Sequence, residues 1–328
     1  MDMTTILLPD YGRLPCGGQE SSRIFFGTAN APMLAGQDTT ALLDEMRGLG
    51  INAFDTARGY GLAERVLGNW MALRGNREEL IVLSKCGDLK NGVVHLDAQV
   101  IEEELAQSLK ELRSDYIDVY LLHRDDPNTP IPEYIETLNR ALDAGKIRCF
   151  GVSNWTVERI QEANAYAAAH GLRGFSVSSP HYSLAEQVRD PWGGNCVTVA
   201  GAAHEADRDW YTQQNMPVIA YSTLSRGFFS GKFRAGDMEG AKLALDPPAQ
   251  KGYLCESNME RLHRAEILAK RDGCTVADIN MRYIFATKMN FFAVCATGSG
   301  ERMRQNIAAS RNPLSAADVA FLENGETA

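Results

Sequence analysis

An apolar run meets a carboxylate and a glycine-flanked tyrosine in the segment Asn52-Ala53-Phe54-Asp55-Thr56-Ala57-Arg58-Gly59-Tyr60-Gly61. An aspartate after an apolar run is often a helix N-cap, and a tyrosine between glycines is often a turn residue. Two later apolar runs, however, also end on reactive side chains, at Lys85 and at His123. This repetition favours a functional interpretation, in which buried strands deliver ionisable groups to one edge of the protein.

Short apolar runs alternate along the chain with longer segments of helical periodicity. The runs are eight: Ile24–Phe26, Ile51–Phe54, Leu80–Leu83, Ile117–Leu122, Ile147–Val152, Phe175–Val177, Val218–Tyr221 and Phe291–Cys295. Unbroken apolar strands between helices form parallel sheets buried on both faces, and eight such units close a barrel. The pattern therefore predicts an α/β fold, a (β/α)8 TIM barrel. We expect an N-terminal extension at residues 1–22 and a single barrel domain at residues 23–328.

Capping residues, prolines and glycines mark the starts and ends of the expected helices. Asp38 is a predicted N-cap for a helix that stops at Gly50, and Asp97 is a predicted N-cap for another. Further helices are expected from Pro132 to Gly145 and from Trp155 to Gly171.

Two connections are longer than a packed barrel needs, namely residues 181–216 after the sixth strand and residues 222–255 after the seventh. Long loops in a compact domain are usually functional or mobile, and these follow strands on the side where barrel enzymes place their chemistry.

The composition is that of an ordinary globular protein, with 45% hydrophobic and 23% charged residues. A net charge of −9 argues against nucleic acid or an anionic membrane as a partner, because both require a basic face. The N-terminus lacks a signal sequence and no window approaches the length of a membrane span, so we expect a cytoplasmic protein. The seven cysteines include no C-x-x-C pair and are interpreted as reduced and structural; an alternative for Cys86 is a reactive thiol.

The ends of the apolar runs supply a coherent set of groups for proton transfer. A barrel brings strand ends around one mouth, so Asp55, Tyr60, Lys85 and His123 are expected to converge. For a tyrosine to donate and accept a proton near neutral pH, its pKa must fall by roughly 3, which corresponds to about 4 kcal/mol of interaction free energy. One ammonium at ~4 Å supplies about that amount at an effective dielectric of ~20. Lys85 would therefore lower the pKa of Tyr60, Asp55 would hold Lys85, and His123 would donate to a substrate oxygen.

None of these side chains carries two electrons, so a reduction requires a cofactor. No G-x-G-x-x-G follows a strand, which leaves a phosphate cradle after strands seven and eight. There the sequence places hydroxyls, glycines and a helix N-terminus, which suit phosphate groups. The two segments read Tyr221-Ser222-Thr223-Leu224-Ser225-Arg226-Gly227 and Ala296-Thr297-Gly298-Ser299-Gly300-Glu301-Arg302.

With these motifs the chain resembles a bacterial aldo-keto reductase over roughly residues 23–311. The resemblance rests on FDTARGYG-x-x-E-x-x-LG, the LSK strand, LLHRDDP, GKIRCFGVSNW and IAYSTLSRG, in that order. It implies that Asp55, Tyr60, Lys85 and His123 are the catalytic tetrad, with Tyr60 as general acid/base.

The resemblance also implies which residues bind the cofactor. Ser153 and Asn154 match the pair that holds the nicotinamide carboxamide, and Tyr221 matches the ring that stacks on it. The other expected contacts are Ser179, Ser222, Leu224, Ser225, Gly227, Thr297, Ser299, Arg302 and Asn306. Ser179 replaces a common glutamine, Gln305 replaces a frequent glutamate, and Ala296 replaces a lysine of many NADPH-preferring members. NADP(H) is modestly favoured, and NAD(H) stays open.

Three aromatic residues and one histidine are further candidates for the same site. Trp192, Phe228 and Phe229 are candidates for the pocket wall, with loop packing as the alternative. His181 is a weaker candidate for a substrate contact, whereas His95, His170, His204 and His263 fit solvated or capping positions. No metal site is indicated, because clustered ligands are lacking.

The leading hypothesis is an NAD(P)H-dependent oxidoreductase that interconverts an aldehyde, ketone or sugar carbonyl and its alcohol. The alternative is a regulatory or redox-sensing subunit that binds the cofactor with little turnover. The sequence leaves the physiological substrate, the direction of reaction and the oligomeric state open.

Overall fold

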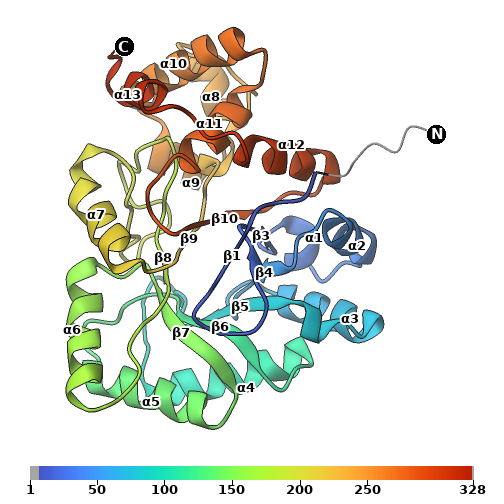
Figure 1. Cartoon of the computed structure of the whole chain (residues 1–328), viewed down its shortest axis with the longest axis vertical. Helices are drawn as coiled ribbons and strands as arrows, with labels where there is room; N and C mark the ends of the chain where they lie inside the picture. The colour runs from blue at the N-terminus through green and yellow to red at the C-terminus, as the bar shows by residue number, and fades with distance from the viewer. Residues whose placement is uncertain (1–6, 327–328) are drawn as a thin grey trace.

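Eight parallel strands close into a barrel in the computed structural model, which describes residues 7–326 (Figure 1). Each strand pairs with the next along the chain, and the last pairs with the first, which confirms the predicted (β/α)8 fold. The strands are β3 (Ile24–Gly27), β4 (Ala53–Asp55), β5 (Ile81–Cys86), β6 (Ile117–Leu122), β7 (Ile147–Ser153), β8 (Ser178–Ser179), β9 (Val218–Ala220) and β10 (Phe291–Cys295).

Only β6 and β10 coincide with the apolar runs that predicted them, and β5 and β8 differ most in extent. β5 continues through Lys85 to Cys86, so this lysine lies inside the strand. β8 begins only at Ser178, one residue after the apolar run ends. The reason is that backbone pairing, here Ser153 with Ser179, defines a strand, and serines pair as well as apolar residues.

The barrel has an apolar interior made by alternate residues of each strand. Side chains of successive residues point to opposite faces, so one set fills the interior and the other packs against the helices. The interior set is Phe25, Ala53, Ile81, Leu83, Val119, Leu121, Cys149, Val177, Ile219 and Phe292. This two-residue period determines which side chains reach the mouth of the barrel.

Helices surround the barrel (Figure 1). The α-helices are α1 (Ala31–Leu34), α2 (Thr40–Gly48), α3 (Ala63–Arg74), α4 (Ala98–Leu112), α5 (Ile131–Asp143), α6 (Val157–Ala169), α7 (Glu205–Gln214), α8 (Met238–Ala244), α9 (Pro247–Tyr253), α10 (Glu256–Asp272), α11 (Val276–Ile284), α12 (Gly300–Ser310) and α13 (Ala316–Asn324). Three short 3₁₀ helices are η1 (Arg77–Glu79), η2 (Ala202–His204) and η3 (Ser225–Gly227).

The predicted helix boundaries hold within two residues. Asp97 caps α4, because its carboxylate accepts a hydrogen bond from the N–H of Val100. The assignment of Asp38 as an N-cap is wrong: α2 begins at Thr40 after Thr39, and Asp38 accepts from the N–H of Thr40 instead. An aspartate two residues before a helix can satisfy the first N–H through a local turn without being the cap.

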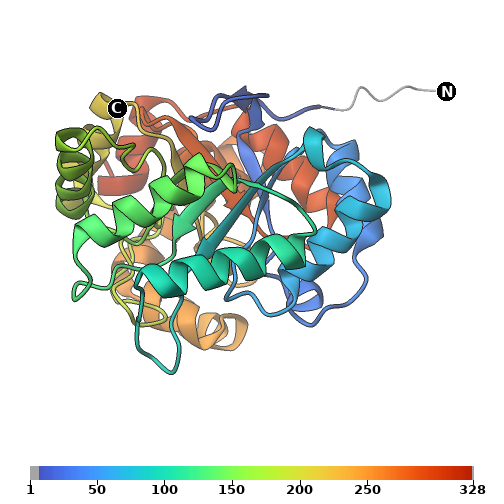
Figure 2. The same ribbon diagram turned by 90° about the horizontal axis from the view of Figure 1, so that it is seen from below.

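An antiparallel hairpin, β1 (Tyr11–Gly12) and β2 (Ser21–Ser22), precedes the barrel. Leu14 of the hairpin is buried with the interior side chains of the barrel. Figure 2 shows the hairpin across one end of the barrel and the orange helices that follow β9 at the opposite end. Of the predicted N-terminal extension, residues 1–6 lie outside the described residues, as do 327–328 of the barrel domain.

Both long loops occur where the sequence predicted them, after β8 and after β9. The first leads into α7, and the second contains η3, α8 and α9. Within residues 7–326, none of the helices combines the length and the apolar character that crossing a bilayer requires.

Candidate active site

Three of the four predicted catalytic residues continue the interior series of their strands. Asp55 follows Ala53 by two positions on β4, and Lys85 follows Leu83 by two positions on β5. His123 lies two positions beyond Leu121, directly after β6. Their side chains therefore point into the barrel at its carboxyl end, and this placement requires only the two-residue period of a strand.

Asp55 and Lys85 form a buried ion pair. The Lys85 ammonium donates to Asp55 Oδ1 at 2.6 Å and to the carbonyl oxygen of Thr56 at 2.9 Å. Burial acts to lower the pKa of Lys85, but the charge of Asp55 and the hydrogen bond to it, with a contribution from Tyr60, outweigh burial and raise the pKa. Burial raises the pKa of Asp55, and Lys85 opposes that rise. Lys85 is accordingly an ammonium at neutral pH.

Tyr60 reaches the same place from the loop after β4. Its ring centroid is 4.9 Å from Lys85 Nζ and 5.7 Å from the His123 ring, which it meets edge to face. The loop can turn because Gly61 has φ +52°, and a Cβ there would come 2.6 Å from the carbonyl oxygen of Leu34. The structure thus brings all four predicted residues together.

The expectation that Lys85 lowers the pKa of Tyr60 below its ordinary value is wrong. Burial raises the pKa of Tyr60, Lys85 lowers it, and Asp55 raises it again, so that the net direction is upward. One ammonium does not offset the desolvation of the phenol, which depends on packing that the sequence does not reveal. Tyr60 therefore keeps its proton at neutral pH, which suits a proton donor.

His123 is neutral at the pH where enzymes usually work. Burial lowers its pKa to about 3, Asp88 opposes that shift, and Lys85 and Arg124 add to it. Its backbone carbonyl accepts a hydrogen bond from Asn154 Nδ2 at 3.1 Å. Its Nδ1 is buried and has no hydrogen-bond partner among the described residues.

The expected nicotinamide residues form a connected group beside the tetrad. Asn154, with φ +60°, accepts from the Tyr221 hydroxyl at 2.7 Å and from the N–H of Val197 at 3.2 Å. Ser153 Oγ donates to the carbonyl oxygen of Ser179 at 2.9 Å. Ser179 Oγ is buried and unpartnered within residues 7–326, as a hydroxyl that awaits a ligand would be. The Ser179 hydroxyl can therefore bond a carboxamide group, whereas Ser153 and Asn154 are hydrogen-bonded to each other and to their neighbours.

The segment after β9 has an unusual backbone. Ser222, Ser225 and Arg226 all have φ +50°, a conformation that non-glycine residues rarely adopt and that often marks ligand-binding loops. The hydroxyl of Ser225 is fully buried and donates to Ser183 Oγ at 2.9 Å, and the N–H of Gly227 donates to the carbonyl oxygen of Leu224 at 3.0 Å. Ser225 and Gly227 therefore shape this loop, and Ser222 keeps a partly exposed side chain.

The N-terminus of α12 forms the other half of the expected phosphate cradle. Ser299 caps the helix by accepting from the N–H of Arg302, and Thr297 Oγ1 accepts from the N–H of Ser299 at 3.2 Å. Arg302 is exposed, whereas Asn306 is buried one turn further along. A helix N-terminus beside the exposed guanidinium of Arg302 fits a phosphate group.

Glu45 of α2 also reaches this helix terminus. Its Oε1 accepts from Arg304 at 2.9 Å, and its carboxylate lies against Gly300, where a Cβ would overlap it. No local sequence pattern indicates an acidic group at this end of α12.

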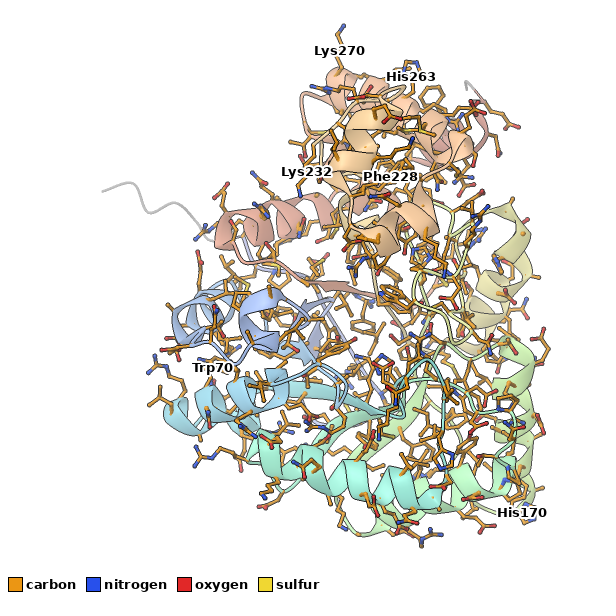
Figure 3. All side chains as sticks on the ribbon, turned by 180° about the vertical axis from the view of Figure 1, so that it is seen from behind. Trp70, His170, Phe228, Lys232, His263 and Lys270 are labelled. Carbon is orange, nitrogen blue, oxygen red and sulfur yellow. The ribbon has the colours of Figure 1, made fainter. Side chains whose placement is uncertain are left out.

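Several further expectations are corrected. Phe228 and Phe229 are fully buried core residues and not pocket walls; Figure 3 shows Phe228 among the helices that follow β9. The thiol of Cys86 is buried, which raises its pKa to about 12, so the reactive-thiol interpretation is wrong. Both ring nitrogens of His181 are occupied, at 2.8 Å from Thr198 Oγ1 and at 3.0 Å from Ser183 Oγ.

Trp192, the third candidate for the pocket wall, lies at the mouth of the barrel. Its ring meets Tyr221 edge to face at 5.9 Å, and the Arg226 guanidinium lies 5.2 Å from its ring centroid. The loop after β8 thereby touches the loop after β9 across the expected cofactor path.

Arg124 and Asp88 are charged residues beside the tetrad that the sequence analysis missed. Arg124 is buried and donates to the carbonyl oxygens of Gly193 and Gly194 at 3.1 and 3.2 Å, which anchors the loop after β8. Both residues follow strand ends, Arg124 directly after His123 and Asp88 three residues after Lys85. A search for every charge within three residues of a strand end would have found them.

Comparisons with known proteins agree on one family. The Aldo/keto reductase family model matches residues 23–324. Aldo-keto reductase YhdN of Bacillus subtilis is 30% identical over 84% of this chain and 81% of its own length. Aldo-keto reductase yakc [NADP(+)] of Schizosaccharomyces pombe is 28% identical over 85% of this chain and 79% of its own length. A probable voltage-gated potassium channel subunit beta of Oryza sativa is also similar, at 29% identity over 74% of this chain and 73% of its own length.

A solved structure shares the fold. The thermostable aldo-keto reductase Tm1743, determined with the inhibitor epalrestat, superposes with a TM-score of 0.71 at 22% identity, over 96% of this chain and 98% of that one.

The fold, the site and the family match together define the class of protein: the chain belongs to the aldo/keto reductase family. It is an NAD(P)-dependent oxidoreductase.

Proposed function

We propose that this enzyme transfers hydride between NAD(P)H and the carbonyl carbon of an aldehyde, ketone or sugar, with Tyr60 as the general acid/base. The observation that carries the proposal is the convergence of Tyr60 with the buried Asp55–Lys85 ion pair and with His123 at one end of the barrel.

The proton chemistry belongs to this chain's own residues. The bound nicotinamide supplies or accepts the hydride. Tyr60 gives its proton to the carbonyl oxygen during reduction, and Lys85 stabilises the phenolate left behind. Asp55 keeps Lys85 charged and in place, and His123 contacts the substrate oxygen. Positioned proton transfer of this kind is worth about 10²- to 10⁴-fold in rate.

Ser153, Asn154, Ser179 and Tyr221 would hold the nicotinamide, and the loop of Ser222 and Leu224 with the N-terminus of α12 would hold the phosphates. Thr297, Ser299, Arg302 and Asn306 are the proposed contacts at α12. Ser225 and Gly227 enter the proposal as residues that hold the loop in shape.

The test is Tyr60→Phe, which removes the proton donor and keeps the ring. Turnover of a panel of aldehydes, ketones and sugars should fall by about 10³-fold or more, while NADPH binding, read by tryptophan quenching, stays nearly unchanged. Tyr166→Phe is the matched control, because Tyr166 lies on α6 with an exposed hydroxyl bonded to Glu136.

An active Tyr60→Phe enzyme would overturn the proposed mechanism. Tight cofactor binding by the unaltered chain without turnover of any carbonyl would instead favour the regulatory-subunit alternative; one relative is named as a probable potassium channel subunit beta.

We also propose that NADP(H) is preferred to NAD(H). Arg302 at the α12 N-terminus supports this preference, and so does the name of one relative, whereas Ala296 lacks the charge of a lysine. Separate titrations with NADPH and NADH test it; tighter NADH binding would reject it.

The partner we propose is a small carbonyl or alcohol, in a cytoplasmic setting. The net charge of −9 supports this choice over nucleic acid or an anionic membrane.

A further inference from the structure

Two cysteine side chains meet at the floor of the barrel, the end where the strands begin. Cys149 lies near the start of β7, and its side chain belongs to the interior set with 6% exposure. Cys16 lies in the turn of the β1–β2 hairpin and packs against the same set. Figure 2 shows this hairpin across one end of the barrel. The two thiols form a cluster that the proposed function does not use.

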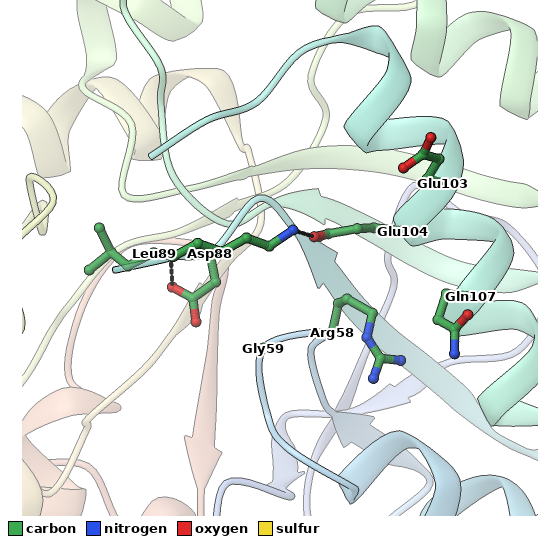
Figure 4. Close-up of a pocket in the computed structure, with 8 residues that line it drawn as sticks. Arg58, Gly59, Asp88, Leu89, Glu103, Glu104 and Gln107 are labelled. Carbon is green, nitrogen blue, oxygen red and sulfur yellow. Dashed lines mark hydrogen bonds and ion pairs between the residues drawn. The ribbon is translucent and has the colours of Figure 1, made fainter. Parts of the chain in front are cut away.

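The active site occupies the opposite end. The tetrad lies where the strands finish, and a pocket of about 360 Å³ opens beside it (Figure 4). Arg58 and Asp88, which line this pocket, belong to the loops after β4 and β5. Chemistry at the floor is therefore separated from chemistry at the mouth by the length of the strands.

Residues on both sides of Cys16 hold it over the start of β7. Leu14, two positions before Cys16, is buried with the interior set. Two positions after Cys16, a Cβ at Gly18 would come 3.6 Å from Nη1 of Arg148. Arg148 directly precedes Cys149 in the chain. Packing of the hairpin turn thus places one cysteine against the other.

The two thiols act on each other. The pKa of Cys16 is lowered, chiefly because its sulfur accepts a hydrogen bond from the Cys149 thiol. The Arg148 guanidinium also lowers this pKa, whereas burial and the Asp118 carboxylate oppose the shift. The same hydrogen bond raises the pKa of Cys149, and burial adds to that rise. Cys16 therefore forms the thiolate more readily, and Cys149 keeps its proton.

We propose that Cys16 and Cys149 form a reversible disulfide when the protein is exposed to hydrogen peroxide, which makes the floor of the barrel a redox modification site. Cys16 is partly exposed and is the thiol that peroxide attacks first, and Cys149 is the resolving thiol. The proposal goes beyond hydride transfer and does not depend on the proposed function. All seven cysteines are free thiols in the structure, as the sequence predicted, and this pair is the one that oxidation joins.

The reaction consumes one peroxide molecule for each pair of thiols. The Cys16 thiolate attacks one peroxide oxygen, so that an S–O bond forms and the O–O bond breaks. The hydroxide that leaves takes up the proton that Cys16 had released and becomes water. The Cys149 sulfur then attacks the sulfenic sulfur of Cys16, so that the S–S bond forms and the S–O bond breaks. The Cys149 proton leaves with this second hydroxide as water, and both peroxide oxygens are reduced.

The turn gives the two sulfurs room to approach. An S–S bond is about 2 Å long, so Cys16 has to move toward β7. Gly17 and Gly18 follow it with φ +71° and +77°, and a Cβ at Gly17 would meet no atom within 4 Å. The turn can therefore shift without displacing packed side chains, while Cys149 stays fixed in the strand.

The disulfide has two consequences for the protein. It protects Cys16 from further oxidation to sulfinic acid, which is irreversible for most proteins. It also joins the hairpin to β7 and closes a long loop of chain, which stabilises the folded state. The melting temperature of the oxidised protein should accordingly rise by on the order of 5 °C.

The experiment treats the reduced full chain with hydrogen peroxide, blocks the remaining thiols with iodoacetamide and maps the tryptic peptides by mass spectrometry. Trypsin releases Cys16 in residues 14–23 and Cys149 in residues 149–159, each without another cysteine. We expect these two peptides to be joined, with a mass smaller by two hydrogens, and to separate after treatment with dithiothreitol. The melting temperature is measured on the same samples.

Two variants test the roles of the two sulfurs. In Cys149→Ser, oxidation of Cys16 should yield a sulfenic acid that dimedone traps, and then sulfinic acid, without the rise in melting temperature. In Cys16→Ser, the buried Cys149 should remain a thiol. Cys255→Ser is the matched control, because it removes a partly exposed thiol that lies 3.3 Å from the Ser257 hydroxyl; it should form the joined peptides as the unaltered chain does.

A Cys16 thiol that survives peroxide while Cys255 is oxidised would overturn the proposal. Sulfinic acid on Cys16 of the unaltered chain, without joined peptides, would overturn it as well. If Cys149→Ser does not fold, the unaltered chain and Cys16→Ser still decide the matter, because Cys16 lies in a partly exposed turn. The peptides report thiol chemistry without turnover, so this result is separate from a failure of the proposed function, which Tyr60→Phe tests.

Discussion

The mouth of the barrel has two halves that are built differently. In the half formed by β4, β5 and β6, the charged groups stand at strand ends and are buried: Asp55, Lys85 and His123 are only 4%, 2% and 6% exposed. In the half formed after β9 and at α12, the charges stand on loops and a helix terminus, and Arg226 and Arg302 are exposed.

The difference follows from what each half has to do. A buried charged side chain on a strand stays beside its partner, because separation would leave an unpaired charge in the interior. Proton transfer therefore takes place in a constant geometry. Charges on the loops and helices of the exposed half hold one another through surface ion pairs, such as Arg226–Asp246 and Arg304–Glu45, which are individually weak. Such pairs can open when a large ligand has to enter and leave.

Breaking one ion pair in each half should give the largest contrast. Lys85→Met leaves Asp55 as a buried, unpaired carboxylate, so we expect a loss of about 3–5 kcal/mol in the free energy of unfolding and a fall of about 10³-fold or more in kcat. Arg226→Met, in the exposed half, should cost less than about 1 kcal/mol. Urea denaturation and steady-state kinetics measure both effects.

A double variant separates stability from catalysis. Asp55→Asn combined with Lys85→Met removes both buried charges, so much of the stability should return while turnover stays lost. Equal costs for the Lys85 and Arg226 variants would mean that the two halves do not differ in the way their burial indicates.

The same contrast explains how much the sequence could predict. The two-residue period carries Ala53 to Asp55, Leu83 to Lys85 and Leu121 to His123, so the strand-borne half follows from local pattern alone. Gly61 marks the turn that brings Tyr60 to them.

The remainder depends on contacts between residues distant in sequence. Three examples are the hydrogen bond from Ser225 to Ser183, the contact of Glu45 with Gly300, and the burial of Phe228 in the core. They depend on how distant segments pack together, which the periodicity of a local segment does not indicate. The direction of the pKa shift of Tyr60 does not follow from local sequence for a related reason, because desolvation depends on the whole packed environment.

A pH profile would sharpen the account of the buried half. Since the pKa of Tyr60 lies above its ordinary value near 10, the phenol is protonated throughout the neutral range. The kcat/KM for reduction should therefore be flat between about pH 6 and pH 9, whereas kcat/KM for alcohol oxidation should rise about tenfold per pH unit as more phenolate forms.

His123 adds no step to this profile, because its pKa of about 3 lies far below the range. Both directions are measured at constant ionic strength, so that screening of surface charges does not imitate a titration. A reduction rate that falls with a midpoint near neutrality would show that Lys85 outweighs burial after all.

The smallest effects belong to the exposed half, where the cofactor's phosphates are proposed to bind. Arg302→Gln should weaken NADPH binding about tenfold, the value of one charge-assisted hydrogen bond, and leave NADH binding nearly unchanged. Glu45→Gln should act in the opposite direction and tighten NADPH binding roughly threefold, because its carboxylate lies at the same helix terminus as the proposed phosphate and repels it through solvent.

Arg311→Gln serves as the control, since Arg311 stands at the other end of α12 and its guanidinium contacts the carbonyl oxygen of Leu8. Fluorescence titrations of each variant with NADPH and NADH give the ratio of affinities directly. A ratio that moves in opposite directions for Arg302→Gln and Glu45→Gln would place the distinguishing phosphate at α12, between a cation that attracts it and a carboxylate that opposes it. A ratio that neither variant changes would mean that the exposed half binds the rest of the cofactor and leaves the choice between NADPH and NADH to residues elsewhere on the mouth.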